Sequence, residues 1–393
     1  MTADSVIIVG AGRAGVSAAL ALRQAGFTAQ IRLYSDEIEW PYDRPPLSKS
    51  LADDASTHAG ILSEAEADTH ALDLVRGVRV VAIDTKNRRV RTSIGEDSFD
   101  ALILATGGTA KALPALPVDN EHVFSLRTCG DARNITAALG RSGRVAIIGG
   151  GWLGLEVAAA ARTLGKHVAV FEAAATLCPR SLPPAVGDHL RRMHEAHGVQ
   201  IVTHSAATFE RNGAGVAVHH ADRIECFDIA VVAIGLVPQT TLAIEAGITC
   251  ADGILTDGAG RTSAPDVYAI GDVARFHHDS MRASLRLESW THANVQATLV
   301  AQAICGGQPR YTATPWFWSE QFGRMVQMAG LPQADLELIS EETGDRPLWR
   351  YGRGNRLTAV IGIDRARDVR AASTALAAQF SAAPKAISST QAL

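Results

Sequence analysis

The chain has 393 residues, which exceeds the usual size of one domain and predicts two or three. Its net charge is −4, with lysine and arginine scattered along the sequence, so it lacks the basic face of a nucleic-acid binder. No apolar run reaches the ~18 residues that a membrane-spanning helix needs. We therefore expect neither a nucleic-acid partner nor a membrane partner.

The cysteines are odd in number and widely spaced, and they form neither a C-x-x-C pair nor a metal-ligand cluster. They are Cys129, Cys178, Cys226, Cys250 and Cys305. We expect reduced thiols, packed as small apolar side chains, in a cytoplasmic protein without a bound metal. Because the first predicted strand begins near residue 5, no signal peptide is expected.

The first predicted element is a β-branched strand, residues 6–9, which runs into the motif GAGRAG at residues 10–15 and then into an Ala/Leu-rich helix. In such a G-x-G-x-x-G motif the first glycine allows a tight turn, the second lets the backbone approach a pyrophosphate, and the third lets helix and strand pack closely. The pyrophosphate sits on the helix N-terminus. The next strand, residues 29–35, ends at Asp36 and Glu37, which are two candidates for a ribose hydroxyl.

A loop with three prolines follows at residues 39–49. The prolines argue against a regular helix there, and a rigid loop of this kind often serves function. Residues 78–83 and 88–92 predict short strands. Residues 99–104 predict a buried strand that ends in a glycine turn at Gly107.

A second copy of the glycine motif, GGGWLG at residues 149–154, follows a strand at residues 145–148. The next strand, residues 167–171, ends at Glu172. A unit of strand, turn, helix, strand and acid is thus present twice, which predicts two dinucleotides in one chain. Two dinucleotides in turn suggest electron transfer between them.

The remaining elements complete the fold prediction. Residues 229–234 predict a buried strand, residues 267–269 a short strand that meets Gly271 and Asp272, and residues 287–304 a helix. After residue 309 a tryptophan cluster precedes a strand at 358–363, a helix near 371–380 and a last dozen residues expected to be disordered.

These elements predict an α/β fold with two Rossmann-like dinucleotide-binding domains and a C-terminal α+β domain. Residues 1–110 and 238–308 would form the first domain, which is discontinuous. Residues 111–237 would form the second domain and residues 309–393 the third.

The sequence resembles the two-dinucleotide flavoprotein reductases of the glutathione-reductase-like superfamily. Within it, the chain is similar to the ferredoxin reductases of bacterial oxygenase systems, of the putidaredoxin-reductase and Rieske-dioxygenase-reductase type. The resemblance covers nearly the whole chain. The segments that carry it are residues 41–49, 105–107, 149–156, 268–272, 286–290 and 315–321.

The resemblance implies that the first motif binds FAD. Either Asp36 or Glu37 would reach the adenosine ribose, since only one can point inward. Asp272 would hold the ribityl chain, and Glu288 and Trp290 would lie by the isoalloxazine ring. The other FAD contacts that it implies are Gly10, Gly12, Ala14, Gly15, Arg44, Lys49, Val80, Ala105, Thr106, Gly107, Arg127 and Gly271.

The second motif would bind the nicotinamide cofactor. A carboxylate at Glu172 accepts hydrogen bonds from a ribose 2′-OH and repels a 2′-phosphate, and residues 173–175 are all alanine, so NADH is expected rather than NADPH. Arg180 matches a family position near the cofactor, and a solvated surface arginine is the alternative. The other implied contacts on this side are Gly149, Gly151, Trp152, Leu153, Gly154, Glu156 and Gly235.

Lys49 and Glu156 form a candidate catalytic pair. In the family the lysine sits beside the flavin N5 edge, and the glutamate of the second motif's helix holds it. A fixed positive charge there would favour the reduced, anionic flavin. An ion pair that only joins two domains is the other interpretation, and the two are compatible.

Missing residues narrow the reaction. Disulfide reductases of the superfamily carry a redox cysteine pair after the first acid, and peroxidase and oxidase relatives carry one cysteine there. Residues 36–62 contain none, so thiol chemistry is not expected. Trp316 and Trp318 would share one face of a strand. By resemblance one of them would cover the flavin near the partner's docking face, and a plain hydrophobic core is the alternative.

The function implied is that of an NADH:ferredoxin oxidoreductase. Hydride would pass from NADH to FAD, and single electrons would then pass to a small [2Fe–2S] ferredoxin that supplies an oxygenase. The contact with the ferredoxin would be transient, and relatives of the chain are monomers or homodimers. One alternative is a reductase of rubredoxin, a quinone or another small molecule. Another is a binding flavoprotein similar to apoptosis-inducing factor.

Overall fold

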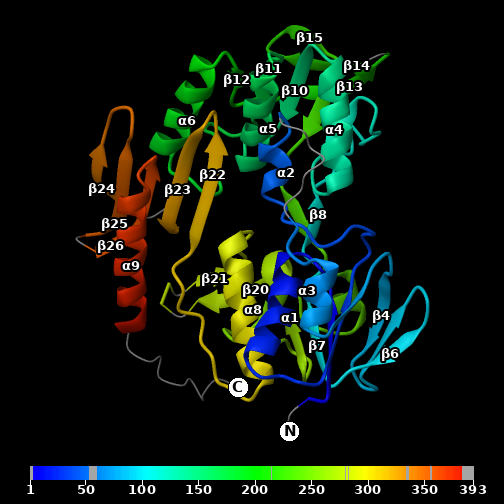
Figure 1. The fold of residues 1–393 in the computed structure, drawn as a ribbon. Coiled ribbons are helices and arrows are strands. Elements are labelled where there is room, and N and C mark those ends of the chain that lie inside the picture. The colour runs from blue at the N-terminus through cyan, green and yellow to red at the C-terminus, as the bar shows by residue number, and fades with distance from the viewer. Residues whose placement is uncertain are drawn as a thin grey trace.

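The chain folds into three lobes, each built around its own five-stranded sheet (Figure 1). The computed structural model describes residues 3–52, 60–213, 215–278, 280–281, 283–332, 336–354 and 356–382. The last dozen residues were expected to be disordered, and from residue 383 on they lie outside these ranges. Among the helices within the ranges, none is both long and apolar enough to cross a membrane.

The first lobe contains a parallel sheet in the order β19-β7-β1-β2-β3. Its strands are β1 (Ser5–Val9), β2 (Gln30–Tyr34), β3 (Leu72–Val75), β7 (Ala101–Leu104) and β19 (Val267–Ala269). The segment β19 comes from a part of the chain far beyond the others, so the lobe is discontinuous in sequence. The parallel strands end at one edge of the sheet, where such folds bind ligands.

The second lobe repeats this arrangement in the order β12-β11-β10-β16-β9, again with parallel strands. Its strands are β9 (Val123–Ser125), β10 (Arg144–Ile148), β11 (His167–Phe171), β12 (Gln200–Val202) and β16 (Ile229–Val232). The antiparallel pair β8 (Gly108–Ala110) and β17 (Leu236–Pro238) carries the chain between the two lobes.

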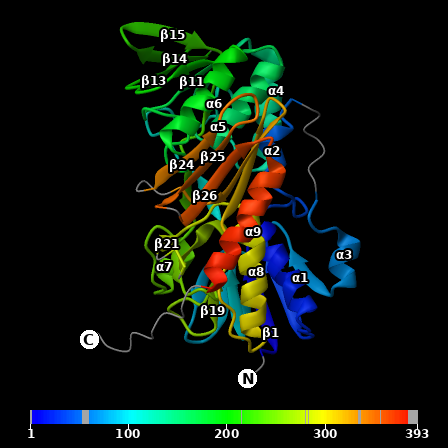
Figure 2. The same ribbon diagram turned by 90° about the vertical axis from the view of Figure 1, so that its left-hand side faces the viewer.

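The third lobe contains an antiparallel sheet in the order β22-β23-β26-β25-β24, and helix α9 lies along it (Figure 2). Its strands are β22 (Trp316–Gln321), β23 (Arg324–Gly330), β24 (Glu337–Glu342), β25 (Leu348–Arg353) and β26 (Arg356–Ile363). Two parallel-sheet lobes and this α+β lobe confirm the predicted fold class.

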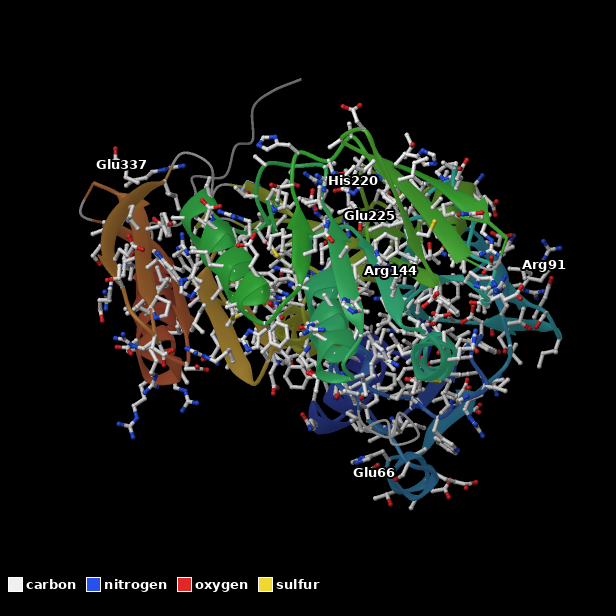
Figure 3. The ribbon with its side chains drawn as sticks, turned by 90° about the horizontal axis from the view of Figure 1, so that it is seen from above. Glu66, Arg91, Arg144, His220, Glu225 and Glu337 are labelled. Carbon is white, nitrogen blue, oxygen red and sulfur yellow. The ribbon has the colours of Figure 1, made fainter. Side chains whose placement is uncertain are left out.

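Three small sheets extend the two nucleotide-type lobes. Their strands are β4 (Val80–Asp84), β5 (Arg89–Thr92) and β6 (Glu96–Ser98); β13 (Thr208–Asn212), β14 (Gly215–His220) and β15 (Arg223–Phe227); and β18 (Ile254–Thr256), β20 (Ala274–His278) and β21 (Ala283–Leu285). Viewed from above, Arg91 marks the small sheet of the first lobe, Glu225 that of the second, and Glu337 the third lobe (Figure 3).

The helices flank the sheets. They are α1 (Arg13–Gln24), α2 (Pro46–Lys49), α3 (Glu64–Thr69), α4 (Cys129–Arg141), α5 (Trp152–Thr163), α6 (Pro184–Ala196), α7 (Thr241–Glu245), α8 (Trp290–Ile304) and α9 (Ala366–Ala382), with a 3₁₀ turn at η1 (Gly271–Val273). Helix α8 begins three residues later than predicted because the Ser289 hydroxyl accepts a hydrogen bond from His292 N, 3.2 Å, and so caps it.

The proline-rich loop contains a helical turn that the sequence interpretation excluded. Helix α2 begins at Pro46. Proline is tolerated at the first helical position because the N–H that it lacks would have no intrahelical partner there. The correction matters for the site, since α2 ends with Ser48 and Lys49.

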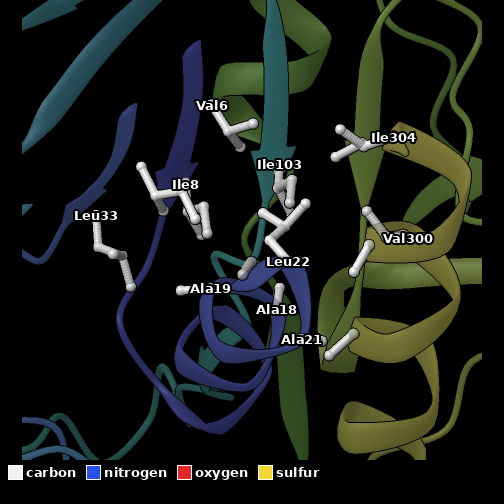
Figure 4. Packing of buried hydrophobic residues seen from close by; sticks show 14 of the residues in the cluster. Val6, Ile8, Ala18, Ala19, Ala21, Leu22, Leu33, Ile103, Val300 and Ile304 are labelled. Carbon is white, nitrogen blue, oxygen red and sulfur yellow. The ribbon is translucent and has the colours of Figure 1, made fainter. Parts of the chain in front are cut away.

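Helices α1 and α8 cover one face of the first sheet. Ala18 and Leu22, one turn apart on α1, face the strand residues Ile8 and Ile103, while Val300 of α8 packs alongside (Figure 4). All five side chains are buried. Burying each large aliphatic side chain stabilises the fold by about 1.5–3 kcal/mol. This packing fixes the N-terminus of α1 at the sheet edge where the site forms.

Candidate functional site

A cavity reaches all three lobes. Its volume of about 2410 Å³ exceeds twice the ~1,000 Å³ upper range of pockets for one small ligand, so it has room for two nucleotides. Its wall includes both glycine turns, the proline-rich loop and strand β22. The sequence-predicted site residues line it, apart from Gly15 and Gly154.

The two glycine turns have the same backbone geometry. Gly10 has φ +106° and Gly149 has φ +108°, a conformation that favours glycine. A Cβ at Gly10 would lie 2.3 Å from Ala105 O, and a Cβ at Gly149 would lie 2.5 Å from Ala233 O. Neither position can accommodate a side chain, which keeps each turn tight.

The helices that follow these turns have uncapped N-termini at the cavity. Gly12 is the N-cap of α1 and Gly151 that of α5, and neither helix has a capping side chain or an acid in its first turn within the described residues. A Cβ at either glycine would meet no described heavy atom within 4 Å. Free N–H groups and the helix dipole therefore face open space, an arrangement that suits a pyrophosphate.

Gly15 and Gly154 have a packing role. A Cβ at Gly15 would lie 1.9 Å from Gly10 O, and one at Gly154 would lie 2.1 Å from Gly149 O. These glycines hold the helix against its own strand, as the third glycine of the motif should. Neither glycine lines the cavity, and the cofactor contact that the resemblance implied for them stays a prediction.

The strand-end acids differ between the two lobes. Val9 pairs with Tyr34 and Ile148 with Phe171, so Ser35 lies beside the first turn where Glu172 lies beside the second. Sequence reasoning missed this one-residue offset and Ser35, because a serine before two acids carries no signal by itself.

Asp36 and Glu37 both line the cavity but have different partners. Glu37 accepts hydrogen bonds from Arg44 Nη2, 2.6 Å, and from the Tyr42 hydroxyl. Among the described residues, Asp36 pairs with Arg79 at the surface, at 3.3 Å, and its side chain is 57% exposed. Glu37 therefore ties down the proline-rich loop, while the Asp36 carboxylate is more accessible to a ribose.

Two arginines converge on the first nucleotide site. Arg44 Nη1 donates to Arg127 O at 2.5 Å, and Arg127 Nη2 contacts Asp272 Oδ2 at 3.1 Å. Burial lowers the pKa of Arg127. Its Nε is buried and has no hydrogen-bond partner among the described residues. An unmet cationic donor in the cavity wall fits an acceptor on a bound nucleotide, and so these residues fit FAD.

The residues expected beside a flavin ring gather at the same end. Arg286 Nη1 donates to Glu288 Oε1 at 2.7 Å. Arg13 lies over the ring of Trp290, 4.9 Å from its centroid, and both Arg13 and the indole N–H donate to Asp43. Val80, Ala105, Thr106, Gly107 and Gly271 also line the cavity. Sequence reasoning missed Arg13 and Asp43, although each lies inside a motif that it quoted.

The tryptophans of β22 lie on one face, which confirms the alternation predicted for a strand. The rings of Trp316 and Trp318 are 5.3 Å apart between centroids, and Trp318 meets Trp290 edge-on at 6.2 Å. Trp290 is 37% exposed. The cluster therefore joins the cavity to the surface of the molecule.

Lys49 and Glu156 meet across the lobes. Lys49 Nζ lies 2.9 Å from Glu156 Oε1, and both residues line the cavity. The Glu156 side chain is only 7% exposed and also accepts hydrogen bonds from the hydroxyls of Ser48 and Ser319. A buried carboxylate with several donors holds the lysine in a fixed place. Neither serine was singled out from the sequence.

The second nucleotide site is built around Glu172. Its Oε2 accepts from Gly150 N at 2.7 Å and its Oε1 from Ala174 N at 2.8 Å, which fixes the carboxylate at the cavity wall. The Arg180 guanidinium lies 3.5 Å from where a Cβ would be at Gly235. Trp152 and Leu153 line the cavity near the start of α5.

The cysteines are free, but not all of them are core residues. Cys129 and Cys178 are buried, whereas Cys226 is exposed on β15 and Cys250 and Cys305 are half-buried. The expectation of five core thiols is therefore wrong for Cys226. Burial raises the pKa of Cys178, the cysteine at the cavity wall, which disfavours a reactive thiolate there.

Comparison with known proteins agrees with this geometry. Residues 4–297 match the pyridine nucleotide-disulphide oxidoreductase family, and residues 316–392 match the reductase C-terminal family. The chain is 37% identical over 388 residues to the ferredoxin–NAD(+) reductase component of the anthranilate 1,2-dioxygenase system of Burkholderia cepacia, with 96% of this chain and 95% of the relative covered. It is 36% identical over 396 residues to rhodocoxin reductase of Rhodococcus erythropolis, with coverages of 97% and 91%.

A solved structure is similar over almost its whole length. The covalent complex of putidaredoxin reductase with putidaredoxin contains a chain that superposes with a TM-score of 0.90 at 33% identity, with 96% of this chain and 93% of that chain covered. The glycine turns, the shared cavity and these matches lead to one conclusion: the chain belongs to the pyridine nucleotide-disulphide oxidoreductase family.

Proposed function

We propose that the protein is an FAD-dependent NADH:ferredoxin oxidoreductase. The observation that carries this proposal is the pair of uncapped glycine-turn helices, α1 and α5, that open into one cavity. Each has a strand-end carboxylate nearby, and a tryptophan cluster lies at the mouth. When bound, FAD takes up the hydride of NADH and releases single electrons to a carrier.

The first lobe holds FAD in this proposal. Residues 1–110 and 238–308 form the FAD domain, residues 111–237 the NAD domain, and residues 309–393 the flavin cover and docking domain. Asp36 binds the adenosine ribose, since its side chain is 57% exposed, whereas that of Glu37 is 25% exposed and ties down the proline-rich loop. Arg127 meets the phosphates or the ribityl chain together with Asp272.

The second lobe binds NADH. Backbone N–H groups at the start of α5 face the pyrophosphate, and Glu172 accepts hydrogen bonds from the ribose 2′-OH. The carboxylate repels a 2′-phosphate, so NADPH binds more weakly. Arg180 and Gly235 lie on the same side of the cavity and help to position the nucleotide.

Lys49 holds a positive charge at the cavity wall, which favours a reduced, anionic flavin in its neighbourhood. The protein supplies position and electrostatics and needs no acid or base of its own. The stretch 36–62, where thiol-dependent relatives carry cysteine, has none, so electrons leave directly to a partner. Trp290, Trp316 and Trp318 lie on that exit side.

The electron acceptor is a small [2Fe–2S] ferredoxin that supplies an oxygenase. The named relatives support a ferredoxin-type acceptor, because one is the reductase of a dioxygenase system and another is seen bound to putidaredoxin. Docking is transient, as is usual for electron-transfer complexes. The free thiols favour a cytoplasmic location, and the protein acts as a monomer or a homodimer.

The test is coupled turnover. The FAD-loaded protein is mixed with NADH and cytochrome c, with and without a [2Fe–2S] ferredoxin. Cytochrome c reduction should depend on the ferredoxin, and NADH should be preferred to NADPH. Equal rates with and without several ferredoxins of this type, despite reduction of the flavin by NADH, would exclude this acceptor class and favour a small-molecule acceptor.

A further inference from the structure

Helix α5 and strand β22 meet through two neighbouring pairs of side chains. Trp152 and Glu156 are four residues apart on the helix, and Phe317 and Ser319 are two apart on the strand, so each pair shares a face. The rings of Trp152 and Phe317 are 5.0 Å apart between centroids, and Ser319 Oγ lies 2.6 Å from Glu156 Oε1. The third lobe thereby reaches the Lys49–Glu156 pair.

The hydroxyl of Ser319 must donate its proton to Glu156. An ionised carboxylate is a pure acceptor, and here its Oε1 receives both Lys49 Nζ and Ser319 Oγ, while its Oε2 receives Ser48 Oγ. Donors from α2 and from β22 thus fix the carboxylate from two sides. Ser319 has no exposed surface, so water cannot replace it without rearrangement.

The direction of the Ser319 hydroxyl is fixed by two further buried side chains. Gln321 Nε2 donates to Ser319 Oγ at 3.0 Å, and His194 Nε2 lies 2.8 Å from Gln321 Oε1. Because that amide oxygen can only accept, His194 carries its proton on Nε2. Its Nδ1 then has a lone pair and can only accept a hydrogen bond, and this buried atom has no partner among the described residues. Each link donates toward Glu156, an arrangement in which hydrogen bonds strengthen one another.

The hairpin that ends β22 is anchored to the second lobe. Phe322, at the tip, stacks on His197 with centroids 3.9 Å apart and meets His194 edge-on at 5.0 Å. Its φ of +54° is unusual for a bulky residue, and such strain persists only where surrounding contacts hold it. The anchored tip fixes the position of β22 along α6. It therefore also fixes the position of Ser319 opposite Glu156.

We propose that Ser319 is a positioning residue for electron transfer: it fixes the Glu156 carboxylate and, through it, the charge of Lys49 at the flavin edge of the cavity. The inference rests on the proposed function in so far as FAD occupies that cavity. Strand β22 then has two roles. One face places Trp316 and Trp318 at the exit, and the other sets the lysine, so seating of the third lobe controls both.

The experiment measures the midpoint potential of the bound FAD in wild type, Ser319→Ala, Ser319→Thr and Ser142→Ala. Ser142 is the matched control, because it is also buried but donates to Ala138 O at the end of α4. The alanine variant frees the carboxylate and so loosens Lys49. We expect a potential about 30 mV more negative, which is about tenfold in the two-electron equilibrium and matches the loss of one hydrogen bond to a charged group.

The variants separate positioning from packing. Ser319→Thr keeps the hydroxyl and should lie closer to wild type than Ser319→Ala does, and Ser142→Ala should not change the potential. In single turnover, hydride transfer from NADH to Ser319→Ala should slow about tenfold with unchanged affinity for NADH. An unaltered potential in Ser319→Ala, or an equal change in Ser142→Ala, would overturn the inference.

Gln321→Met provides a second test should Ser319→Ala fail to hold FAD. It removes the donor to Ser319 without touching Glu156, so a smaller negative change in potential is expected, and no change would overturn the inference. Failure of the proposed function has a different signature, since wild type itself would then bind no FAD or would not be reduced by NADH.

Discussion

The first and second lobes use the same turn but different strand ends. Gly10 and Gly149 agree in φ within two degrees, +106° and +108°, and a Cβ at either would strike the carbonyl of the neighbouring strand. Beside the turn, however, the first lobe has Ser35 where the second has Glu172. In the proposed function, the shared backbone geometry binds the pyrophosphate that both cofactors contain, and the residue at the strand end distinguishes FAD from NADH.

The largest effect is expected at the turns. Gly149→Ala places a Cβ 2.5 Å from Ala233 O at a positive φ, so NADH affinity should fall by at least about 100-fold while the protein stays yellow. Gly10→Ala should instead yield protein without FAD. Flavin absorbance and NADH titration measure both. Gly165→Ala, at φ +74° but with no described heavy atom near its Cβ, controls for backbone strain alone. Loss of FAD in Gly149→Ala would contradict the division of the two sites.

A second prediction concerns the charge between the lobes. Lys49→Met removes the cation that Glu156 holds, and hydride transfer from NADH should slow by about 100-fold, as when one preorganised stabilising group is lost. Stopped-flow reduction of the flavin measures this rate. Lys86→Met, at an exposed position on the first lobe, is the control. A wild-type rate in Lys49→Met would leave the ion pair with a structural role only.

The third prediction sharpens the contrast between the strand ends. Glu172→Gln removes the repulsion of a 2′-phosphate, so the preference for NADH over NADPH should decrease by about tenfold. Asp36→Asn should weaken FAD binding and leave the nicotinamide preference intact. The ratio of kcat/KM for the two nucleotides measures the preference. If Asp36→Asn changed that ratio, or if Glu172→Gln left the ratio as in wild type, the acids would be assigned to the wrong cofactors.

The smallest effect concerns pH and compares a buried histidine from each region. Burial lowers the pKa of His194, on α6, to about 4 and that of His292, on α8, to about 3. Both pKa values lie below the ~6.5 of a histidine in the unfolded chain. The unfolding free energy therefore has its full value above pH ~6.5, where both histidines are neutral, and it decreases as the pH falls toward the pKa values of the folded state. For His194 this amounts to about 3 kcal/mol of unfolding free energy.

The measurement is the unfolding free energy as a function of pH in His194→Gln and wild type. Glutamine cannot titrate but can still donate to Gln321, so the variant should show a weaker loss of stability between pH ~6.5 and ~4. Parallel curves for the two proteins would mean that His194 does not titrate on unfolding as described.

Local motifs predicted much of this molecule. Glycine spacing and β-branched runs identified both turns and the fold class, and strand alternation placed Trp316 and Trp318 on one face. Contacts between distant segments were not predictable in the same way. Ser319 lies 163 residues from Glu156, and only the docking of β22 on α5 brings them together.

Two corrections have local causes. A proline-rich loop was expected to exclude helix, yet Pro46 starts α2, because proline suits a first helical turn. The sequence interpretation expected an acid at the end of β2 without knowing how β2 pairs with β1. Because Val9 pairs with Tyr34, Ser35 lies beside the glycine turn instead. Register depends on the neighbouring strand, and a single sequence does not contain it explicitly.

Electron transfer from NADH through FAD to a ferredoxin can be tested in one anaerobic cycle that is followed by the colour of the flavin. The FAD-loaded protein is mixed with one equivalent of NADH and then with an oxidised [2Fe–2S] ferredoxin. We expect that NADH bleaches the flavin, that NADPH does so far more slowly, and that colour returns only as ferredoxin becomes reduced. A flavin that NADH does not bleach, or that stays bleached while ferredoxin stays oxidised, would contradict transfer between two dinucleotides and a ferredoxin.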